Sequence, residues 1–247
     1  MLEQTAACVS RRDVFYLGMA IAATAVVFGG FAPTYYLKSF AAVTQYPGSA
    51  PVSPSLPLLI RLHAMVSTTW LVLLLAQTTL VTAGRTDLHR RLGITGTVVA
   101  PLLAVLGVMT AIRGARDGWN PGGPFPDSLG FLVVTLGDIL LFSSFVAAGF
   151  YYRRQRELHK RLMVLGTLAG LMWPAITRMP YVAPRLLPMF GLLFLLVIAM
   201  PVRDYLAQRR VHPISIWGSV AIVASFPIRQ LIGTSDTWRH FAAWLIT

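Results

Sequence analysis

The sequence predicts an all-helical membrane bundle of about seven transmembrane helices, most of them paired in repeated two-helix hairpins. Three observations lead to this prediction. More than half of the residues (55%) are hydrophobic and only 12% are charged, whereas a typical soluble domain carries about 25% charged residues. The hydrophobic residues fall in blocks of about twenty, the length needed to cross roughly 30 Å of hydrocarbon. A short histidine motif also recurs at a constant spacing, as expected of a duplicated structural unit.

Seven hydrophobic blocks account for most of the chain, so we treat residues 1–247 as a single transmembrane domain. The expected spans are 14–36, 57–83, 93–113, 129–152, 161–178, 185–202 and 213–232. Span one precedes three expected hairpins, at 57–113, 129–178 and 185–232. The remaining residues, 233–247, form a short amphipathic segment that we expect to lie along the membrane surface.

The first block follows Arg11 and Arg12, a pair that faintly resembles a twin-arginine export signal. The block is too long for the hydrophobic core of a signal peptide, and no clear cleavage site follows it. We therefore interpret it as an uncleaved first membrane helix. The single cysteine, Cys8, excludes an internal disulfide or a thiolate metal cluster.

The repeated motif places a histidine at the start of a returning helix. Its first copy is Asp87-Leu88-His89-Arg90-Arg91-Leu92, and its second copy, 70 residues later, is Glu157-Leu158-His159-Lys160-Arg161-Leu162. A fainter third copy is His212 followed by Gly218-Ser219. The three returning helices end in Arg113, Arg178 and Arg229. The hairpins are therefore predicted to be parallel repeats, with histidines at one membrane surface and arginines at the other.

The basic residues predict the orientation in the membrane. If the N-terminus is cytoplasmic, thirteen of the 21 lysines and arginines fall on inner segments, in agreement with the positive-inside rule. We therefore expect a bacterial inner (cytoplasmic) membrane protein with a periplasmic C-terminus and its three motif histidines at the cytoplasmic surface. The net charge of +12 then reflects topology. A nucleic-acid partner is not expected, because its site would need basic residues and aromatics on a soluble face.

The histidine turns also have a purely structural interpretation. Asp87 and Glu157 fall just before a predicted helix start, where a carboxylate caps free N–H groups. The basic residues after them hold the turn in the anionic inner leaflet. Neither role requires a histidine, so both topology and a ligand, proton or cofactor role remain open for His89, His159 and His212.

A second set of polar residues lies in the outer half of the predicted bundle. Asp138 falls near the bilayer centre, where an ionised carboxylate is costly unless it is paired or hydrated. We expect it to pair with His63 or with one of the outer arginines, which are Arg61, Arg113, Arg178 and Arg229. His63 shares one helical face with Ser67, Trp70 and Gln77, and that face should point into the bundle. These residues form either one buried ion pair that sets helix register or an outward-open polar cavity.

Three classes of function fit these residues, and no catalytic residue is predicted. The sequence lacks a glycine-rich phosphate loop, a zinc-protease helix and a nucleophile turn. The first class is a haem-linked or redox protein that binds haem b through His89 and His159, with His212 in reserve. The position of these histidines at helix ends argues against it. The second is a transporter or sensor for a small anion or protons, built on the outer cavity. The third is an accessory or assembly subunit of a larger membrane complex, such as a respiratory complex.

The combination of motifs resembles a family of bacterial multi-pass inner-membrane proteins without an assigned function. The resemblance extends over nearly the whole chain and rests on four segments. They are His63, Trp70 and Gln77 in the second span, Gly84-Arg85 through Leu92-Gly93, Leu158 through Met163, and Val211-His212-Pro213. It implies the architecture and an inner-membrane location, but no activity. A weaker likeness connects the histidine span and turn to oxidase-assembly membrane proteins and to b-type cytochromes.

Overall fold

The computed structural model describes residues 11–38, 40, 56–120, 125–179, 182 and 185–247. Within this part the regular structure is entirely helical, which confirms the predicted fold class. The helices are α1 (Arg11–Phe31), the π-helical turn η1 (Ala32–Tyr36), α2 (Leu58–Thr82), α3 (Thr86–Arg116), α4 (Ser128–Tyr151), α5 (Arg156–Ile176), α6 (Leu186–Gln208), α7 (Pro213–Gly233) and α8 (Asp236–Ile246). Cys8, on which one sequence prediction rests, lies outside the described residues.

Six helices are long and apolar enough to cross a membrane: α1 continued by η1, α2, α3, α4, α6 and α7. The fifth predicted span, which is α5, falls outside this group because its first turns carry Arg156, Glu157, Lys160 and Arg161. It is nevertheless the central helix of the bundle and packs against α1, α4, α6 and α7. A helix enclosed by other helices exposes little surface to lipid, so it needs a less apolar sequence than its neighbours.

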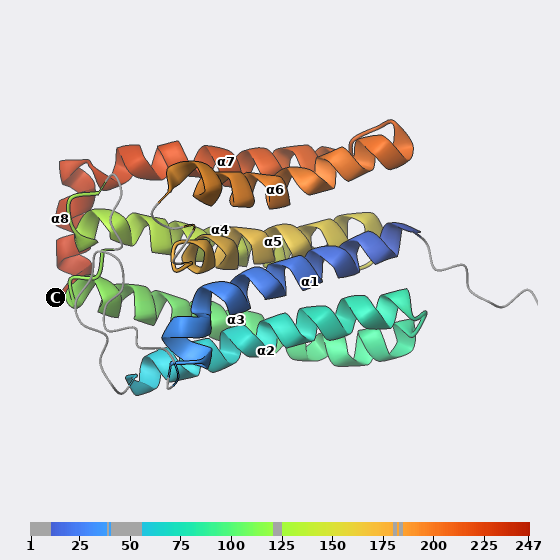
Figure 1. Cartoon of the computed structure of the whole chain (residues 1–247), viewed down its shortest axis with the longest axis horizontal. Helices are drawn as coiled ribbons and strands as arrows, with labels where there is room; N and C mark the ends of the chain where they lie inside the picture. The colour runs from blue at the N-terminus through green and yellow to red at the C-terminus, as the bar shows by residue number, and fades with distance from the viewer. Residues whose placement is uncertain (1–10, 39, 41–55, 121–124, 180–181, 183–184) are drawn as a thin grey trace, which may run out of the picture.

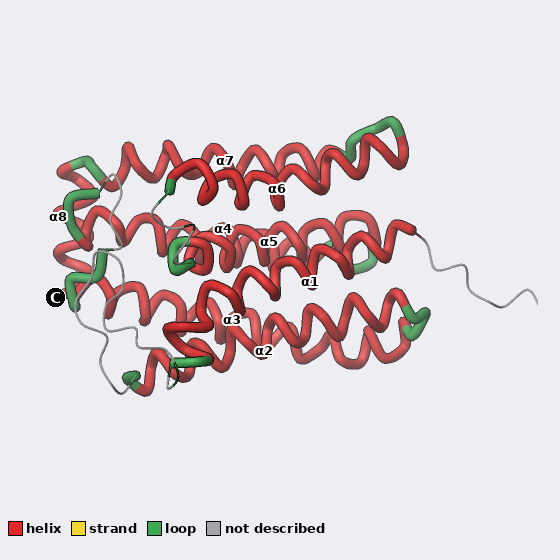
Figure 2. Tube along the Cα trace, viewed as in Figure 1, coloured by secondary structure: helices red, strands yellow, loops and turns green. Residues whose placement is uncertain are grey.

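The helices pair as three antiparallel hairpins, α2–α3, α4–α5 and α6–α7 (Figures 1 and 2). Their turns, at residues 83–85, 152–155 and 209–212, all lie at the end of the bundle where α1 begins. We call this end the histidine end. Connections this short make consecutive helices pack side by side in antiparallel orientation. Gly84 supports the first turn because it adopts a left-handed backbone, with φ of 72°.

The opposite end of the bundle carries α8, so we call it the α8 end (Figure 1). The helix lies across the ends of α3, α4 and α7, and its Trp238 indole donates to the backbone carbonyl of Leu129 at 2.8 Å. The expected amphipathic C-terminal segment is therefore a helix, and it folds back onto the bundle.

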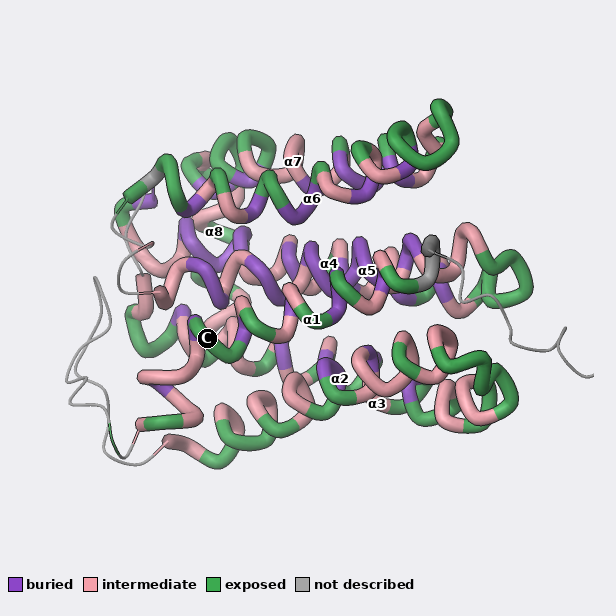
Figure 3. Tube along the Cα trace, turned by 45° about the vertical axis from the view of Figure 1, so that its right-hand side comes forward, coloured by how far each residue is buried: buried purple, intermediate pink, exposed green. Residues whose placement is uncertain are grey.

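Burial is concentrated around α4 and α5, while the outward faces of the other helices remain exposed (Figure 3). Large exposed side chains such as Ile94 and Leu140 fit a bundle whose perimeter meets lipid.

Small residues allow the closest helix approaches. A Cβ atom on Gly30 would lie only 2.1 Å from the Ala175 carbonyl oxygen, so glycine is required for α1 to reach α5.

Candidate functional site

The first two hairpins bring two motif histidines together. The rings of His89 and His159 lie 6.2 Å apart between centroids, with their planes at 81°. Each histidine is the fourth residue of its helix, since α3 begins at Thr86 and α5 begins at Arg156. The repeated motif thus has the same register in both hairpins, and the packing of these hairpins directs the two rings toward each other. We call His89 and His159 the histidine pair.

The hydrogen bond of His159 defines which ring nitrogen carries a proton when the ring is neutral. Its Nδ1 atom lies 2.8 Å from the carbonyl oxygen of Gly149 in α4. A carbonyl oxygen only accepts, so Nδ1–H is the donor and Nε2 keeps a free lone pair. This arrangement is typical of histidines that bind metals through Nε2.

Two buried side chains near the pair have polar atoms without a hydrogen-bond partner in the part of the chain that the structure describes. They are Nδ1 of His89 and both amide atoms of Gln77. The His89 ring lies against the Gln77 backbone, while the Gln77 amide approaches α3 near Gly93. Buried polar atoms are normally satisfied, and each exception calls for an explanation such as a bound group. The region between α2, α3 and α5 at the histidine end is therefore a candidate binding site.

The third motif histidine has a different role. His212 is the N-cap of α7, and its Nδ1 accepts a hydrogen bond from the Ile214 backbone N–H at 3.2 Å. Its neutral ring therefore carries the proton on Nε2. Burial, followed by the positive charge of Arg161, lowers the pKa of His212 below its usual 6.5. The structure thus separates His212 from the histidine pair and places it beside a network of charged groups.

The predicted capping role of the two motif acids is wrong. Each N-cap lies two residues before the motif acid, at Arg85 and Gln155, and neither residue makes a side-chain cap. Asp87 and Glu157 lie inside the first turn instead. A carboxylate there still interacts favourably with the helix dipole. Glu157 additionally binds Lys160 and Arg161 of its own helix.

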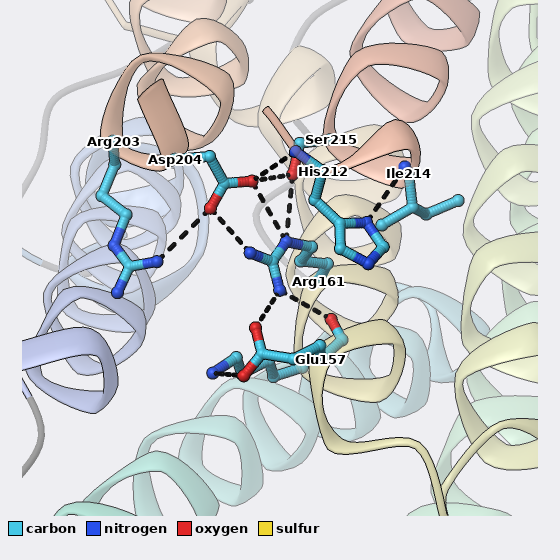
Figure 4. A network of polar contacts seen from close by, with 8 residues as sticks. Glu157, Arg161, Arg203, Asp204, His212, Ile214 and Ser215 are labelled. Atoms are coloured by element: carbon cyan, nitrogen blue, oxygen red, sulfur yellow. Dashed lines mark hydrogen bonds and ion pairs between the residues drawn. The ribbon is translucent and has the colours of Figure 1, made fainter. Parts of the chain in front are cut away.

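A buried charge network joins the second and third hairpins (Figure 4). At its centre Arg161 of α5 and Asp204 of α6 have only 1% and 0% of their side-chain surface exposed. Arg161 donates from Nη2 to Oδ1 of Asp204 at 2.6 Å and from Nε to Oδ2 at 3.2 Å. The two bonds form a bidentate pair, which is the strongest geometry available to an arginine and a carboxylate.

Three further groups complete the coordination of the Asp204 carboxylate. The Ser215 hydroxyl donates to Oδ2 at 2.7 Å, the backbone N–H of His212 lies 3.4 Å from the same oxygen, and Arg203 donates to Oδ1 at 3.3 Å. The network therefore ties α5, α6 and α7 together at the histidine end. The network was not predicted, because the sixth span was expected to end at residue 202, whereas α6 continues to Gln208 and buries Asp204.

The buried acid of the fourth helix has one arginine as its partner. Asp138 binds Nη1 of Arg229 at 2.5 Å, and both residues are only 5% exposed. Arg229 also donates to the backbone carbonyl of Val134 at 3.2 Å. Gly137 provides the space for this arginine, because a Cβ atom there would lie 2.4 Å from its Nε. Among the five partners considered from the sequence, the structure thus selects Arg229.

The other residues assigned to an outer cavity have separate surroundings. Arg61 is exposed, and Arg113 forms a solvent-accessible pair with Asp117 at 3.3 Å. Arg178 donates to the Pro174 carbonyl at 2.6 Å and lies over the rings of Phe31 and Trp119. Nδ1 of His63 is buried and has no hydrogen-bond partner among the described protein atoms. The four arginines therefore do not converge on one group.

Comparisons with protein-family models, curated proteins and solved structures give no match for this chain.

Proposed function

We propose that this membrane bundle is a haem-linked redox protein in which His89 and His159 would hold a b-type haem. The single observation that carries the proposal is the placement of the two rings, 6.2 Å apart at one end of the bundle. Two imidazoles bound to one metal ion place their ring centroids about 6 Å apart, because each metal–nitrogen bond is about 2 Å and each nitrogen lies about 1 Å from its ring centre.

The protonation pattern of His159 fits a ligand role. His159 directs Nδ1–H to the Gly149 carbonyl, which leaves the Nε2 lone pair for iron. Nδ1 of His89 and the Gln77 amide are buried without a hydrogen-bond partner among the described residues. Each histidine is the fourth residue of its helix, at the close of the first turn.

The number of ligands favours haem over a metal ion bound by side chains alone. In the described part of the chain, no group of three or more histidine, cysteine, aspartate or glutamate residues could hold a metal ion. A porphyrin supplies four ligands itself and needs only two from the protein. Arg90 and Arg91 are exposed beside His89 and offer cations for the haem carboxylates.

The protein would hold the haem and shield it from water. When bound, the haem supplies one-electron transfer. The histidine pair holds and orients it, and the surrounding apolar helices limit access of water. The proposal includes the orientation predicted from the basic residues, with the histidine end in the cytoplasm of a bacterial inner membrane. The electron partner would then be another membrane subunit, such as part of a respiratory complex.

The absorption spectrum of the purified protein tests this proposal. The protein is expressed with added haem precursor, purified in detergent and measured oxidised and then dithionite-reduced. We expect a Soret band and a reduced α-band of b-type, both lost in His89→Ala and in His159→Ala. His212→Ala and His240→Ala are the matched controls and should keep the bands. A spectrum without a Soret band, or bands that survive loss of either paired histidine, would refute the assignment.

The outer-cavity alternative has weaker support. A transporter or sensor for a small anion would need Asp138 and the outer arginines to face a common space. Asp138 instead neutralises Arg229 inside the bundle, as expected of an ion pair that sets helix register.

A further inference from the structure

A groove at the histidine end lies outside the proposed haem site. Its volume is about 750 Å³, within the range of roughly 300–1,000 Å³ typical of small-molecule sites. It is formed where the start of α5 meets the start of α7. The lining residues are Gln155, Arg156, Glu157, Leu158, His212, Pro213, Ile214 and Trp217. We call it the α5–α7 groove.

The polar wall of the α5–α7 groove is suited to an anion. Arg156 is exposed and has no acidic partner within the described residues. His212 presents Nε2–H as a donor, since its Nδ1 accepts from the backbone of α7. Glu157 is the one acidic residue in the lining, and its charge is already compensated by Lys160 at 2.7 Å and by Arg161. The groove therefore offers two donors and little net negative charge.

The surroundings of the groove strengthen its positive potential. Four more arginines are exposed on the two adjacent turns. They are Arg153 and Arg154 on the α4–α5 turn, and Arg209 and Arg210 on the α6–α7 turn. Each basic residue near an anionic membrane surface contributes about 1 kcal/mol to lipid attraction, or about fivefold in affinity. Clusters of this kind at a membrane boundary are typical of sites for anionic lipid headgroups.

The apolar wall indicates that the anion belongs to a lipid. Trp217, on the second turn of α7, is 69% exposed. Ile214, Pro213 and Leu158 complete an apolar lining beside the two donors. Exposed tryptophan at this depth of a spanning helix is typical of the membrane interface, where its ring contacts lipid. A free inorganic anion has no apolar part that could pack against this wall.

We propose that the α5–α7 groove binds the headgroup of an anionic phospholipid, with its phosphate held by Arg156 and the Nε2–H of His212 and its acyl chain against Trp217. A phosphate oxygen accepts from both donors, and the guanidinium can bind two oxygens at once. The lipid would bridge the second and third hairpins on their outer surface, next to the internal bridge formed by Arg161 and Asp204. This site is independent of the proposed haem site.

Tryptophan quenching by brominated lipids tests the proposal. The full-length protein is reconstituted in phosphatidylcholine vesicles that contain either brominated phosphatidylglycerol or brominated phosphatidylcholine at the same low mole fraction. The Trp217→Phe variant identifies the signal of Trp217 against the other five tryptophans. We expect the anionic lipid to quench Trp217 with an apparent affinity higher than that of the zwitterionic lipid by about fivefold or more.

Two variants and a competitor define the outcome. Arg156→Gln should lower the lipid preference about fivefold, whereas Arg154→Gln, an exposed arginine that does not line the groove, should lower it clearly less. Inorganic phosphate at millimolar concentration should not displace the brominated lipid. Equal quenching by both lipids, equal effects of the two arginine variants, or displacement by phosphate would each overturn the proposal. Far-UV circular dichroism of both variants verifies that they remain folded.

Discussion

Replacing Asp204 by asparagine removes the negative charge opposite Arg161 with almost no change of shape. In the native protein Asp204 accepts two hydrogen bonds from that guanidinium, at 2.6 and 3.2 Å, and both side chains are essentially inaccessible. Hydrogen bonds to charged groups contribute about 1.5–3 kcal/mol each. Breaking one side of a buried ion pair costs about 3–5 kcal/mol. The Arg161 charge keeps a second partner in the half-exposed Glu157, so we expect a loss near 3 kcal/mol in the free energy of unfolding.

Equilibrium unfolding in mixed micelles measures this loss. The wild type and Asp204→Asn are titrated with sodium dodecyl sulfate in a mild detergent, and helical circular dichroism is followed. Asp87→Asn is the matched control, because Asp87 is mostly exposed and lies 3.9 Å from its partner Arg85; exposed pairs contribute about 0–1 kcal/mol. Because Asp204 joins α6 to α5 and α7, hydrogen exchange should also increase first in the third hairpin.

The double variant Arg161→Met/Asp204→Leu separates the charge from the packing. It leaves no unpaired charge, so it should be less destabilised than Asp204→Asn alone. A loss below about 1 kcal/mol for Asp204→Asn, equal to that of the exposed control, would refute the reasoning that the pair is desolvated. A double variant less stable than the single variant would show that the network contributes more than charge compensation.

Two further substitutions test close contacts elsewhere in the bundle. Gly137→Ala should lower the free energy of unfolding by about 1–3 kcal/mol, because its Cβ would lie 2.4 Å from Nε of the buried Arg229. The control is Gly18→Ala, where nothing lies within 4 Å of the added Cβ. It should be neutral or slightly stabilising in the same detergent titration. Trp70→Phe removes the indole N–H that donates to Thr167 at 3.1 Å. It should lower the midpoint of thermal unfolding by the equivalent of about 1 kcal/mol, and an unchanged midpoint would indicate that this buried bond contributes nothing.

The histidine pair illustrates how far a repeat in the sequence can predict a site. The equal spacing of the two motifs correctly placed His89 and His159 at the same position of two parallel hairpins. It could not reveal that their rings lie 6.2 Å apart, since this depends on how α3 packs beside α4 and α5. The third copy lacks the basic pair, and its histidine became a helix N-cap instead. The absence of the basic pair after His212 was therefore the sequence feature that indicated a different role for this histidine.

The buried position of Asp204 was not predicted because the end of its helix was placed too early in the sequence. Asp204 follows Arg203 closely and precedes Arg209, so in the sequence it resembles an acid of a polar loop. The structure extends α6 past it and encloses it, because the Arg161 guanidinium and the Ser215 hydroxyl compensate the cost of burying its charge. Boundaries of helices near polar residues are difficult to predict for this reason.

The sequence by itself determined the architecture of this protein, because the bilayer imposes length and apolar composition on every spanning helix. The short turns then required antiparallel hairpins and brought the motif histidines to one end. Only the tertiary structure decided which charges meet. Asp138 lies 91 residues from Arg229, and Arg161 lies 43 residues from Asp204. Such pairs depend on the rotation and depth of each helix within the bundle, and these are set by side-chain packing among all neighbouring helices.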